Sequence, residues 1–234
     1  MAIPVSQTHE AVRQTAREFA TAELEPIYRE WNEKGEFPYH VVDEMAAAGL
    51  RGIMAPEEYG GAGMGMLSHS IAMEEISRVW PSAGIKMDEG LFRFLRMFGT
   101  DEQKERYLPG LCAGELVDAI ALSEPDHGSD FAGITTTAEV IDGGYVLNGN
   151  KMWVTNAGKA DLMAVTAKTD PTERHRGISL FLVEPKTMDG CTVEPGIDMM
   201  GFERARSTVH NGYKRPSYSP AAPNHRITSR STRR

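Results

Sequence analysis

A chain of 234 residues, 41% of them hydrophobic, has room for one large or two modest globular domains. No apolar run approaches the length of a membrane-spanning helix and the mean hydropathy is −0.37, so we expect no membrane partner. A net charge of −8 argues against nucleic acid as the main partner. Cys112 and Cys191 lack the spacing of metal ligands, and residues 1–6 lack a secretion signal. We therefore expect no metal and a cytoplasmic location.

The first half of the sequence predicts a helical domain over residues 1–116. Pro81 is expected to close one helix, and Thr100 begins a capping box whose short helix should stop near Pro109. Three glycines and a proline within residues 56–63 predict an ordered loop with unusual backbone angles. Apolar residues recur at helical spacing in four stretches, at residues 12–20, 41–46, 67–80 and 91–98.

Near residue 116 the pattern changes to short strands, which predicts an antiparallel β-barrel domain over residues 117–205. Asp142-Gly143 and Asn148-Gly149 predict hairpin turns, because both central positions of such turns favour a positive φ. The fold class is therefore α+β, and residues 206–234, which hold seven basic and no acidic residues, are expected to form a disordered basic tail. The predicted strands cover residues 117–122, 135–141, 145–147, 152–155, 162–166 and 178–183.

A strand leading into a Gly-Ser loop stands at residues 121–133, with the sequence Ala-Leu-Ser-Glu-Pro-Asp-His-Gly-Ser-Asp-Phe-Ala-Gly. Such a loop exposes backbone N–H groups and a hydroxyl, which suits a phosphate or the polar edge of a cofactor. It has neither the Gly-Lys-Ser/Thr of a nucleotide-binding loop nor the following helix of a dinucleotide fingerprint. Taken alone, the stretch is only a weak sign of phosphate binding.

The same stretch resembles the signature of the acyl-CoA dehydrogenases, a Ser/Thr-Glu-Pro run followed by Gly-Ser-Asp. Further motifs in the family's order include Phe-Gly-Thr-Asp-Glu-Gln-Lys at residues 98–104 and Asn-Gly-Asn-Lys-Met-Trp-Val-Thr-Asn at residues 148–156. Together the motifs cover nearly all of residues 8–208. His127 departs from the family pattern, which has a small residue there, and we assign it no catalytic role. The resemblance implies a helical domain, a β-barrel domain and a third, helical-bundle domain, of which this sequence shows the first two.

The resemblance also implies FAD as the cofactor. In such proteins a strand end binds the pyrimidine end of the flavin, a Gly-Ser pair holds the pyrophosphate, and a Trp-Val-Thr run lies along the ring. Small polar donors of this kind set the position and electron affinity of the flavin. Ser129 is, in addition, the candidate contact to the CoA of the substrate. Carried over residue by residue, the candidate cofactor-binding residues are Ile120, Leu122, Ser123, Gly128, Ser129, Trp153, Val154 and Thr155.

Two motif residues also have purely structural interpretations. Without the motif, Trp153 would be expected to fill the core of the barrel. Glu124 is interpreted as a buried, hydrogen-bonded structural acid, since the family does not use this residue as its base. The activity that the resemblance implies is the α,β-dehydrogenation of an acyl-CoA thioester, with hydride transfer to FAD and an electron-transfer flavoprotein as the electron acceptor.

This reaction needs a base that removes a proton beside the thioester, usually a carboxylate in a dry site. In the family the base belongs to the third domain, which also drives oligomer assembly, so we assign no catalytic residue here and expect homo-oligomers of intact members. The resemblance ends near residue 208, where the basic tail begins, as a coding frame shift would produce. Reading the coding DNA in its other two frames tests this hypothesis. We expect a truncated enzyme that is weakly active or inactive alone and binds flavin weakly.

Other functions remain open at this point. One is a non-catalytic flavin- or CoA-binding remnant that acts as a partner subunit, which would gain activity on mixing with a full-length subunit. Another is a related flavin oxidase, which would produce peroxide. The basic tail itself has a rival interpretation, a genuine segment that binds an acidic partner or a membrane surface.

Overall fold

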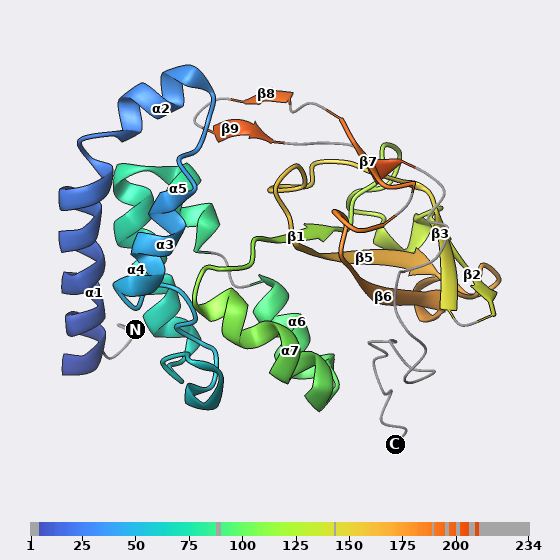
Figure 1. The fold of residues 1–234 in the computed structure, drawn as a ribbon, viewed down its shortest axis with the longest axis horizontal. Helices are drawn as coiled ribbons and strands as arrows, with labels where there is room; N and C mark the ends of the chain where they lie inside the picture. Colours follow the sequence, from blue (N-terminus) through green and yellow to red (C-terminus); the bar gives the residue numbers. More distant parts are fainter. Residues whose placement is uncertain are drawn as a thin grey trace. The chain divides into compact units, whose positions relative to one another are not determined.

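The computed structural model describes residues 5–87, 90–142, 144–188, 190–194, 197–199, 202–205 and 209–210. The chain divides into two compact units (Figure 1). The helical unit is made mainly of Met1–Met97 and Asp101–Leu116, and the β unit is made mainly of Val117–Ile197. Among the described residues, the last α-helix ends at Cys112 and the first strand begins at Asp118, where the sequence pattern changes from helices to strands.

Amphipathic helices form the helical unit. The first begins after Ser6, whose hydroxyl accepts a hydrogen bond from the His9 amide while the His9 ring accepts one from the Ser6 amide. It continues into a short π-helical turn at Ala20–Leu24. The described helices are α1 (Gln7–Phe19), α2 (Tyr28–Lys34), α3 (His40–Ala47), α4 (Met66–Val79), α5 (Pro81–Lys86), α6 (Gly90–Phe98) and α7 (Asp101–Cys112).

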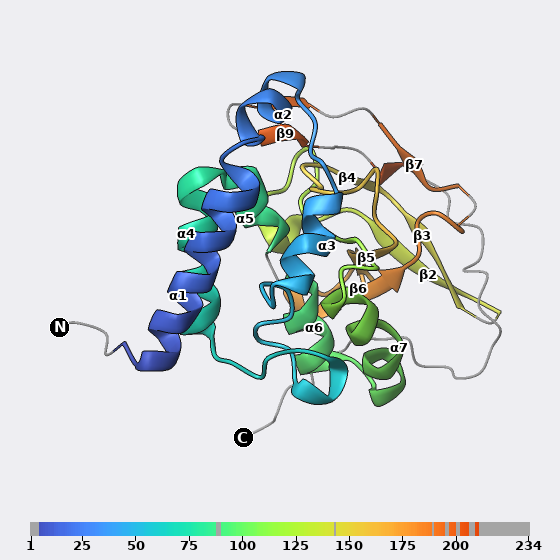
Figure 2. The same ribbon diagram turned by 60° about the vertical axis from the view of Figure 1, so that its left-hand side comes forward.

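The core of the helical unit lies where α1, α3 and α4 bury their apolar stripes. Helices α1 and α4 run side by side in both views (Figures 1 and 2). Ala16, Met45 and Ile76 are fully buried in this core, and Trp80 joins them. Burying a large apolar side chain contributes about 1.5–3 kcal/mol. The helices that the apolar spacing predicts at residues 12–20, 41–46, 67–80 and 91–98 are thus confirmed.

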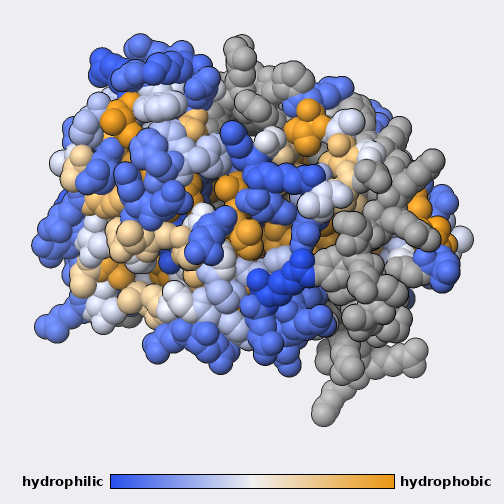
Figure 3. Space-filling view, in the orientation of Figure 1, coloured by the Kyte–Doolittle hydropathy of each residue, from blue (hydrophilic) through white to orange (hydrophobic). Residues whose placement is uncertain are grey.

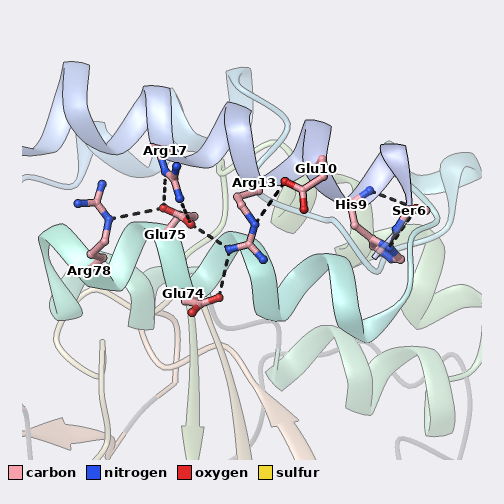
Figure 4. Close-up of polar contacts among 8 residues, drawn as sticks. All are labelled: Ser6, His9, Glu10, Arg13, Arg17, Glu74, Glu75 and Arg78. Atoms are coloured by element: carbon pink, nitrogen blue, oxygen red, sulfur yellow. Dashed lines mark hydrogen bonds and ion pairs between the residues drawn. The ribbon is translucent and has the colours of Figure 1, made fainter. Parts of the chain in front are cut away.

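An ion-pair network joins α1 to α4 beside this core (Figure 4). The carboxylate of Glu75 is 4% exposed and accepts hydrogen bonds from Arg17 Nη2 at 2.8 Å and Arg13 Nη1 at 3.0 Å. Arg78 approaches the same carboxylate at 3.5 Å. The hydrogen bond from Arg17 and further contacts with Arg13 outweigh the effect of burial and lower the pKa of Glu75 to about 2. The network therefore keeps a buried carboxylate ionised at neutral pH.

Of the two prolines predicted to end a helix, Pro81 does so, since α4 ends at Val79, whereas Pro109 does not. Pro81 follows the end of α4 and is the first residue of α5, a position where its missing N–H is not needed. Pro109 lies inside α7, which continues to Cys112 instead of stopping. Leu108 and Leu111, on either side of this proline, are fully buried. Their packing offsets the hydrogen bond that the proline removes.

A five-stranded mixed sheet organises the β unit. Strand β1 pairs in parallel with β5, Asp118 opposite Leu162, and β5 pairs antiparallel with β6. Strands β2 and β3 form a hairpin, and Thr137 also pairs in parallel with Lys168 of β5. Ala119, Met163 and Val165 are among the residues buried on this sheet. The strands of the sheet are β1 (Asp118–Ala121), β2 (Thr137–Ile141), β3 (Gly144–Asn148), β5 (Leu162–Lys168) and β6 (Ile178–Val183).

The predicted antiparallel barrel is not confirmed. Within the described residues the sheet is mixed and does not close on itself. Its two parallel pairings join segments far apart in the chain, and a parallel pair needs a long crossover that leaves no local turn signal. Short strands form two smaller sheets, one of β4 (Asn150–Lys151), β7 (Thr192–Val193) and β10 (Val209–His210), and one of β8 (Ile197–Met199) and β9 (Phe202–Ala205).

One of the two predicted hairpin turns is confirmed. Ile141 pairs with Gly144, so two residues connect β2 to β3. Asn148-Gly149 instead leads from the β2–β3 hairpin into β4, which pairs with β10. Gly149 is required by close approach, since a Cβ there would lie 2.2 Å from the Thr136 hydroxyl oxygen.

Other sequence predictions fall on the loops and on the end of the chain. The loop at residues 56–63 is ordered as expected, with φ of 84° at Gly60 and 62° at Gly63. Strand β10 falls inside the range predicted as a disordered tail, and residues 211–234 lie outside the described part. No described helix is long and apolar enough to cross a membrane. Hydrophilic side chains are spread over the visible face of the helical unit (Figure 3).

Candidate functional site

The eight predicted cofactor-binding residues fall on two segments of the β unit. The first site segment, residues 120–129, is the end of β1 and the turn after it. The second site segment, residues 152–156, follows β4. The Met152 amide donates a hydrogen bond to the Ser123 carbonyl at 2.8 Å. The two segments, far apart in the sequence, are therefore neighbours in the fold.

In the first site segment, the burial of each side chain along and just after β1 decides which of them can contact a ligand. Ala119 and Ala121 are buried, whereas Ile120 and Leu122 are only half-buried. Side chains two residues apart lie on the same face of a strand, so Ile120 and Leu122 share the more open face. Ser123 is also half-buried.

The turn after β1 is closed by its own backbone. Glu124 and His127 exchange hydrogen bonds, from the Glu124 amide to the His127 carbonyl at 2.9 Å and from the His127 amide back at 3.2 Å. Gly128 and Ser129 follow on the exposed surface, and a Cβ at Gly128 would meet no atom within 4 Å. Gly128 therefore leaves open space above an exposed backbone, which fits the approach of a pyrophosphate.

The ring of His127, where the sequence departs from the family, packs over Gly133. A Cβ at Gly133 would lie 2.5 Å from His127 Nδ1 and 2.6 Å from Asp130 Oδ2. The His127 ring therefore fits in the turn only because residue 133 has no side chain.

Residues 152–154 are irregular with a bend at Trp153, a turn begins at Thr155, and the predicted strand over residues 152–155 is wrong. Trp153 has φ of 61° and Asn156 has φ of 66°, both in the left-handed region that disfavours large side chains. The Asn156 side chain donates to the Asp118 carbonyl at 2.9 Å, which fastens the turn to β1. Trp153 is 52% exposed, while Val154 is fully buried. The core-filling role considered for Trp153 is therefore excluded.

An exposed tryptophan in a strained backbone conformation fits a ligand contact. Strain of this kind costs of order 1–3 kcal/mol and persists where the surrounding structure imposes it. Trp153 is exposed, and Thr155, two residues later in the same segment, is half-buried. Val154 offers only its backbone, because its side chain points into the core.

Beneath the two segments, Glu124 forms a buried polar centre. It is 4% exposed, and its Oε2 accepts from the Thr135 amide at 2.6 Å and the Thr135 hydroxyl at 2.7 Å. Its Oε1 accepts from the Thr136 amide at 3.0 Å, from the Thr136 hydroxyl, and from Lys151 Nζ at 2.8 Å. The prediction that Glu124 is a buried structural acid is confirmed.

Burial and hydrogen bonding act in opposite directions on this acid. Burial alone raises the pKa of Glu124, but the hydrogen bonds from Lys151, Thr136 and Thr135 outweigh it and lower the pKa to about 2. Burial also lowers the pKa of Lys151, against the stabilising effect of Glu124. Since the hydrogen bonds favour the charged forms of both partners, we treat this contact as an ion pair at neutral pH.

Sequence reasoning did not single out the partners of Glu124. Lys151 stands two residues before the candidate Trp153 in the motif Asn-Lys-Met-Trp, but no pattern links it to an acid 27 residues earlier. Thr135 and Thr136 carry the β-branched signal of a strand, although they lie just before β2. Nothing in single-residue spacing reveals that these hydroxyls converge on one carboxylate.

The two units carry the domains of an FAD-dependent oxidoreductase family. The N-terminal domain of acyl-CoA dehydrogenases matches residues 6–115 and the middle domain matches residues 119–210. The chain therefore belongs to the acyl-CoA dehydrogenase family. FAD is the cofactor of this family. The exposed Trp153 and the open space at Gly128 fit such a group.

Three similar proteins illustrate the relationship. The mitochondrial short-chain specific acyl-CoA dehydrogenase of Bos taurus is 40% identical over 211 residues, covering 89% of this chain and 51% of the relative. The mitochondrial isovaleryl-CoA dehydrogenase of Arabidopsis thaliana is 42% identical over 197 residues, covering 81% and 47%. A glutaryl-CoA dehydrogenase of Mycobacterium smegmatis in complex with FADH2 has a TM-score of 0.79 and 30% identity, covering 88% of this chain and 52% of that one. The chain spans about half the length of the curated relatives it matches. Because both curated relatives are mitochondrial, the predicted cytoplasmic location is not confirmed.

Proposed function

We propose that this chain functions as the cofactor-binding part of an FAD-dependent acyl-CoA dehydrogenase. Such an enzyme performs the α,β-dehydrogenation of an acyl-CoA thioester. Bound FAD would accept the hydride. The observation that supports the proposal most strongly is Trp153, which is half-exposed and has a left-handed backbone conformation. It belongs to the second site segment, which is hydrogen-bonded to Ser123 through the Met152 amide. Strained backbone conformations of this kind cluster at ligand-binding sites, which supports a ligand contact at Trp153.

The chain's own residues would hold and orient the cofactor. Ser123 and Thr155 would offer hydroxyl and backbone donors to the polar edge of the flavin, and Trp153 would cover its ring. Ile120 and Leu122 would line the same site, with Val154 contributing its backbone. Gly128 and Ser129 would bind the pyrophosphate at the exposed turn. We assign no catalytic base to this chain.

The proposed substrate is an acyl-CoA, with Ser129 as its candidate contact, and the proposed electron acceptor is an electron-transfer flavoprotein. The names of the two curated relatives point to short and branched acyl groups. A panel of butyryl-, isovaleryl- and octanoyl-CoA therefore tests the substrate class. Fold resemblance alone does not fix the acyl group.

The experiment is the visible spectrum of the FAD-loaded chain before and after anaerobic addition of each acyl-CoA. Bleaching of the flavin band supports the dehydrogenase. Flavin bound to this chain that bleaches only after mixing with a full-length family member favours a non-catalytic partner subunit, and flavin of this chain that bleaches in neither sample contradicts the dehydrogenase. Peroxide formed in air on addition of acyl-CoA favours a flavin oxidase instead.

A further inference from the structure

Lys151 lies at the centre of the contacts that hold the two site segments together. Its Nζ donates to the Leu122 carbonyl at 3.0 Å, to Glu124 Oε1 at 2.8 Å and to the Thr166 hydroxyl at 3.1 Å. These acceptors use all three donors of a lysine, and the residue is 1% exposed. One side chain thus ties β4 to the end of β1, to the turn after it and to β5.

Stability does not explain why an ion pair is buried here. Removing two charges from water is costly, and a well-packed apolar pair of similar size is often at least as stable. An apolar pair would fill the same volume but would offer no donor to a carbonyl group. The feature that the ion pair adds is a fixed donor at the Leu122 carbonyl.

The hydrogen bond to Leu122 fixes the direction of one peptide unit. The Leu122 carbonyl and the Ser123 amide belong to the same planar trans peptide, so they point in opposite directions. Because the carbonyl points toward the buried Lys151, the Ser123 amide points away from it. The Met152 amide holds the next carbonyl, that of Ser123, so the peptide units on both sides of this residue are fixed.

We infer that Lys151, held by Glu124, is a positioning residue that aims the Ser123 amide at the flavin site. The inference rests on the proposed function for the identity of the ligand. It does not make Lys151 a catalytic residue, since the side chain acts through the backbone of Leu122 and Ser123.

Four forms of the full chain test this inference. They are the wild type, Lys151→Met, the double variant Lys151→Met with Glu124→Gln, and the control Lys186→Met. Lys151→Met alone leaves a buried carboxylate without its cation, which destabilises the fold. The double variant removes both charges, so it avoids the unpaired buried carboxylate and should recover part of the stability without restoring the donor to Leu122. Lys186→Met removes an exposed lysine of the same unit. Its 2.6 Å ion pair with Asp161 lies at the surface, where solvent and salt weaken it.

The first readouts are the melting temperature, the FAD dissociation constant and the absorption spectrum of bound FAD. We expect the double variant to melt above Lys151→Met but to bind FAD as weakly as that variant does, about tenfold more weakly than the wild type, with a shifted flavin band. Lys186→Met should match the wild type. FAD affinity that simply follows the melting temperature across all four proteins overturns the inference, because a purely structural role predicts that pattern.

Hydrogen exchange of the FAD-free chain separates this inference from the proposed function. We expect the Met152 amide to exchange about tenfold faster in the double variant, while the β5 and β6 amides are unchanged. An unchanged Met152 amide overturns the positioning role. If the wild type binds no FAD, the proposed function fails, whereas the exchange result still decides whether Lys151 orders the two segments.

Discussion

Arg17 of α1 donates two hydrogen bonds to Glu75 of α4, from Nε to Oε2 at 2.9 Å and from Nη2 to Oε1 at 2.8 Å (Figure 4). This two-point contact fixes both the separation and the register of the helices. Because the carboxylate is 4% exposed, it is shielded from solvent in a way that ordinary surface ion pairs are not.

Replacing Glu75 tests this contact through its pH dependence. The folded-state pKa of about 2 lies below the ordinary value of 4.5, so the stabilisation is present above pH 4.5 and is lost as the pH falls toward 2. We expect Glu75→Gln to lower the free energy of unfolding by about 2 kcal/mol at pH 7. The difference from the wild type should shrink between pH 4.5 and 2, as measured by urea unfolding.

Glu74→Gln is the matched control for that experiment. Glu74 is the residue before Glu75 on α4, its side chain is 70% exposed, and its Oε2 lies 3.4 Å from Arg13 Nη1. We expect a change below about 0.5 kcal/mol at every pH. Equal effects at the two positions would contradict the assignment of the stabilisation to the buried carboxylate.

Glu124→Gln should be more damaging than Glu75→Gln. It leaves the buried Lys151 without its anion, and breaking such a pair costs about 3–5 kcal/mol. The loss should be constant between pH 5 and 8, because the pKa of Glu124 is lowered to about 2. Thermal unfolding of the variant and of the wild type measures it. A loss below 1 kcal/mol would show that the pair is not buried as the structure has it.

Two glycines of the β unit should respond in opposite ways to alanine. Gly149→Ala drives a methyl group into the Thr136 side chain, whose hydroxyl binds Glu124, and should cost about 1–3 kcal/mol. Gly128→Ala meets no atom within 4 Å and should not destabilise the fold. Gly128→Ala should weaken FAD binding, because its methyl group occupies the space proposed for the pyrophosphate. Melting temperatures and FAD titrations of both variants check this contrast, and destabilisation by Gly128→Ala would contradict it.

Apolar spacing predicted the helical unit well because its signal is local. The stripes that contain Ala16, Met45 and Ile76 become the buried faces of α1, α3 and α4. The same reasoning failed at Pro109, where tertiary packing of Leu108 and Leu111 outweighs the helix-breaking tendency of proline. Predictions from apolar spacing and from proline were therefore correct only where the tertiary packing favours the same local structure.

The β unit was predicted less well because its pairings are long-range. Strand content was correct for β1, β2, β3, β5 and β6, but the parallel contact of Asp118 with Leu162 has no signature in the sequence. The run Trp153-Val154-Thr155 has high β-propensity, yet Asn156 and the buried Lys151 hold it as a bend and turn. The exposure of Trp153 was therefore visible only in the structure.

The most direct test of the account is a titration of the full chain with FAD, comparing the wild type with Trp153→Ala. Trp153 is 52% exposed, so its loss should change the free energy of unfolding by no more than about 0.5 kcal/mol. We predict that the wild type binds FAD and that Trp153→Ala, folded and equally stable, binds it at least about tenfold more weakly. Val140→Ala, which shortens a side chain 76% exposed on β2, should bind FAD like the wild type. A wild-type chain that binds no FAD, or a Trp153→Ala variant that binds it equally well, would contradict the account.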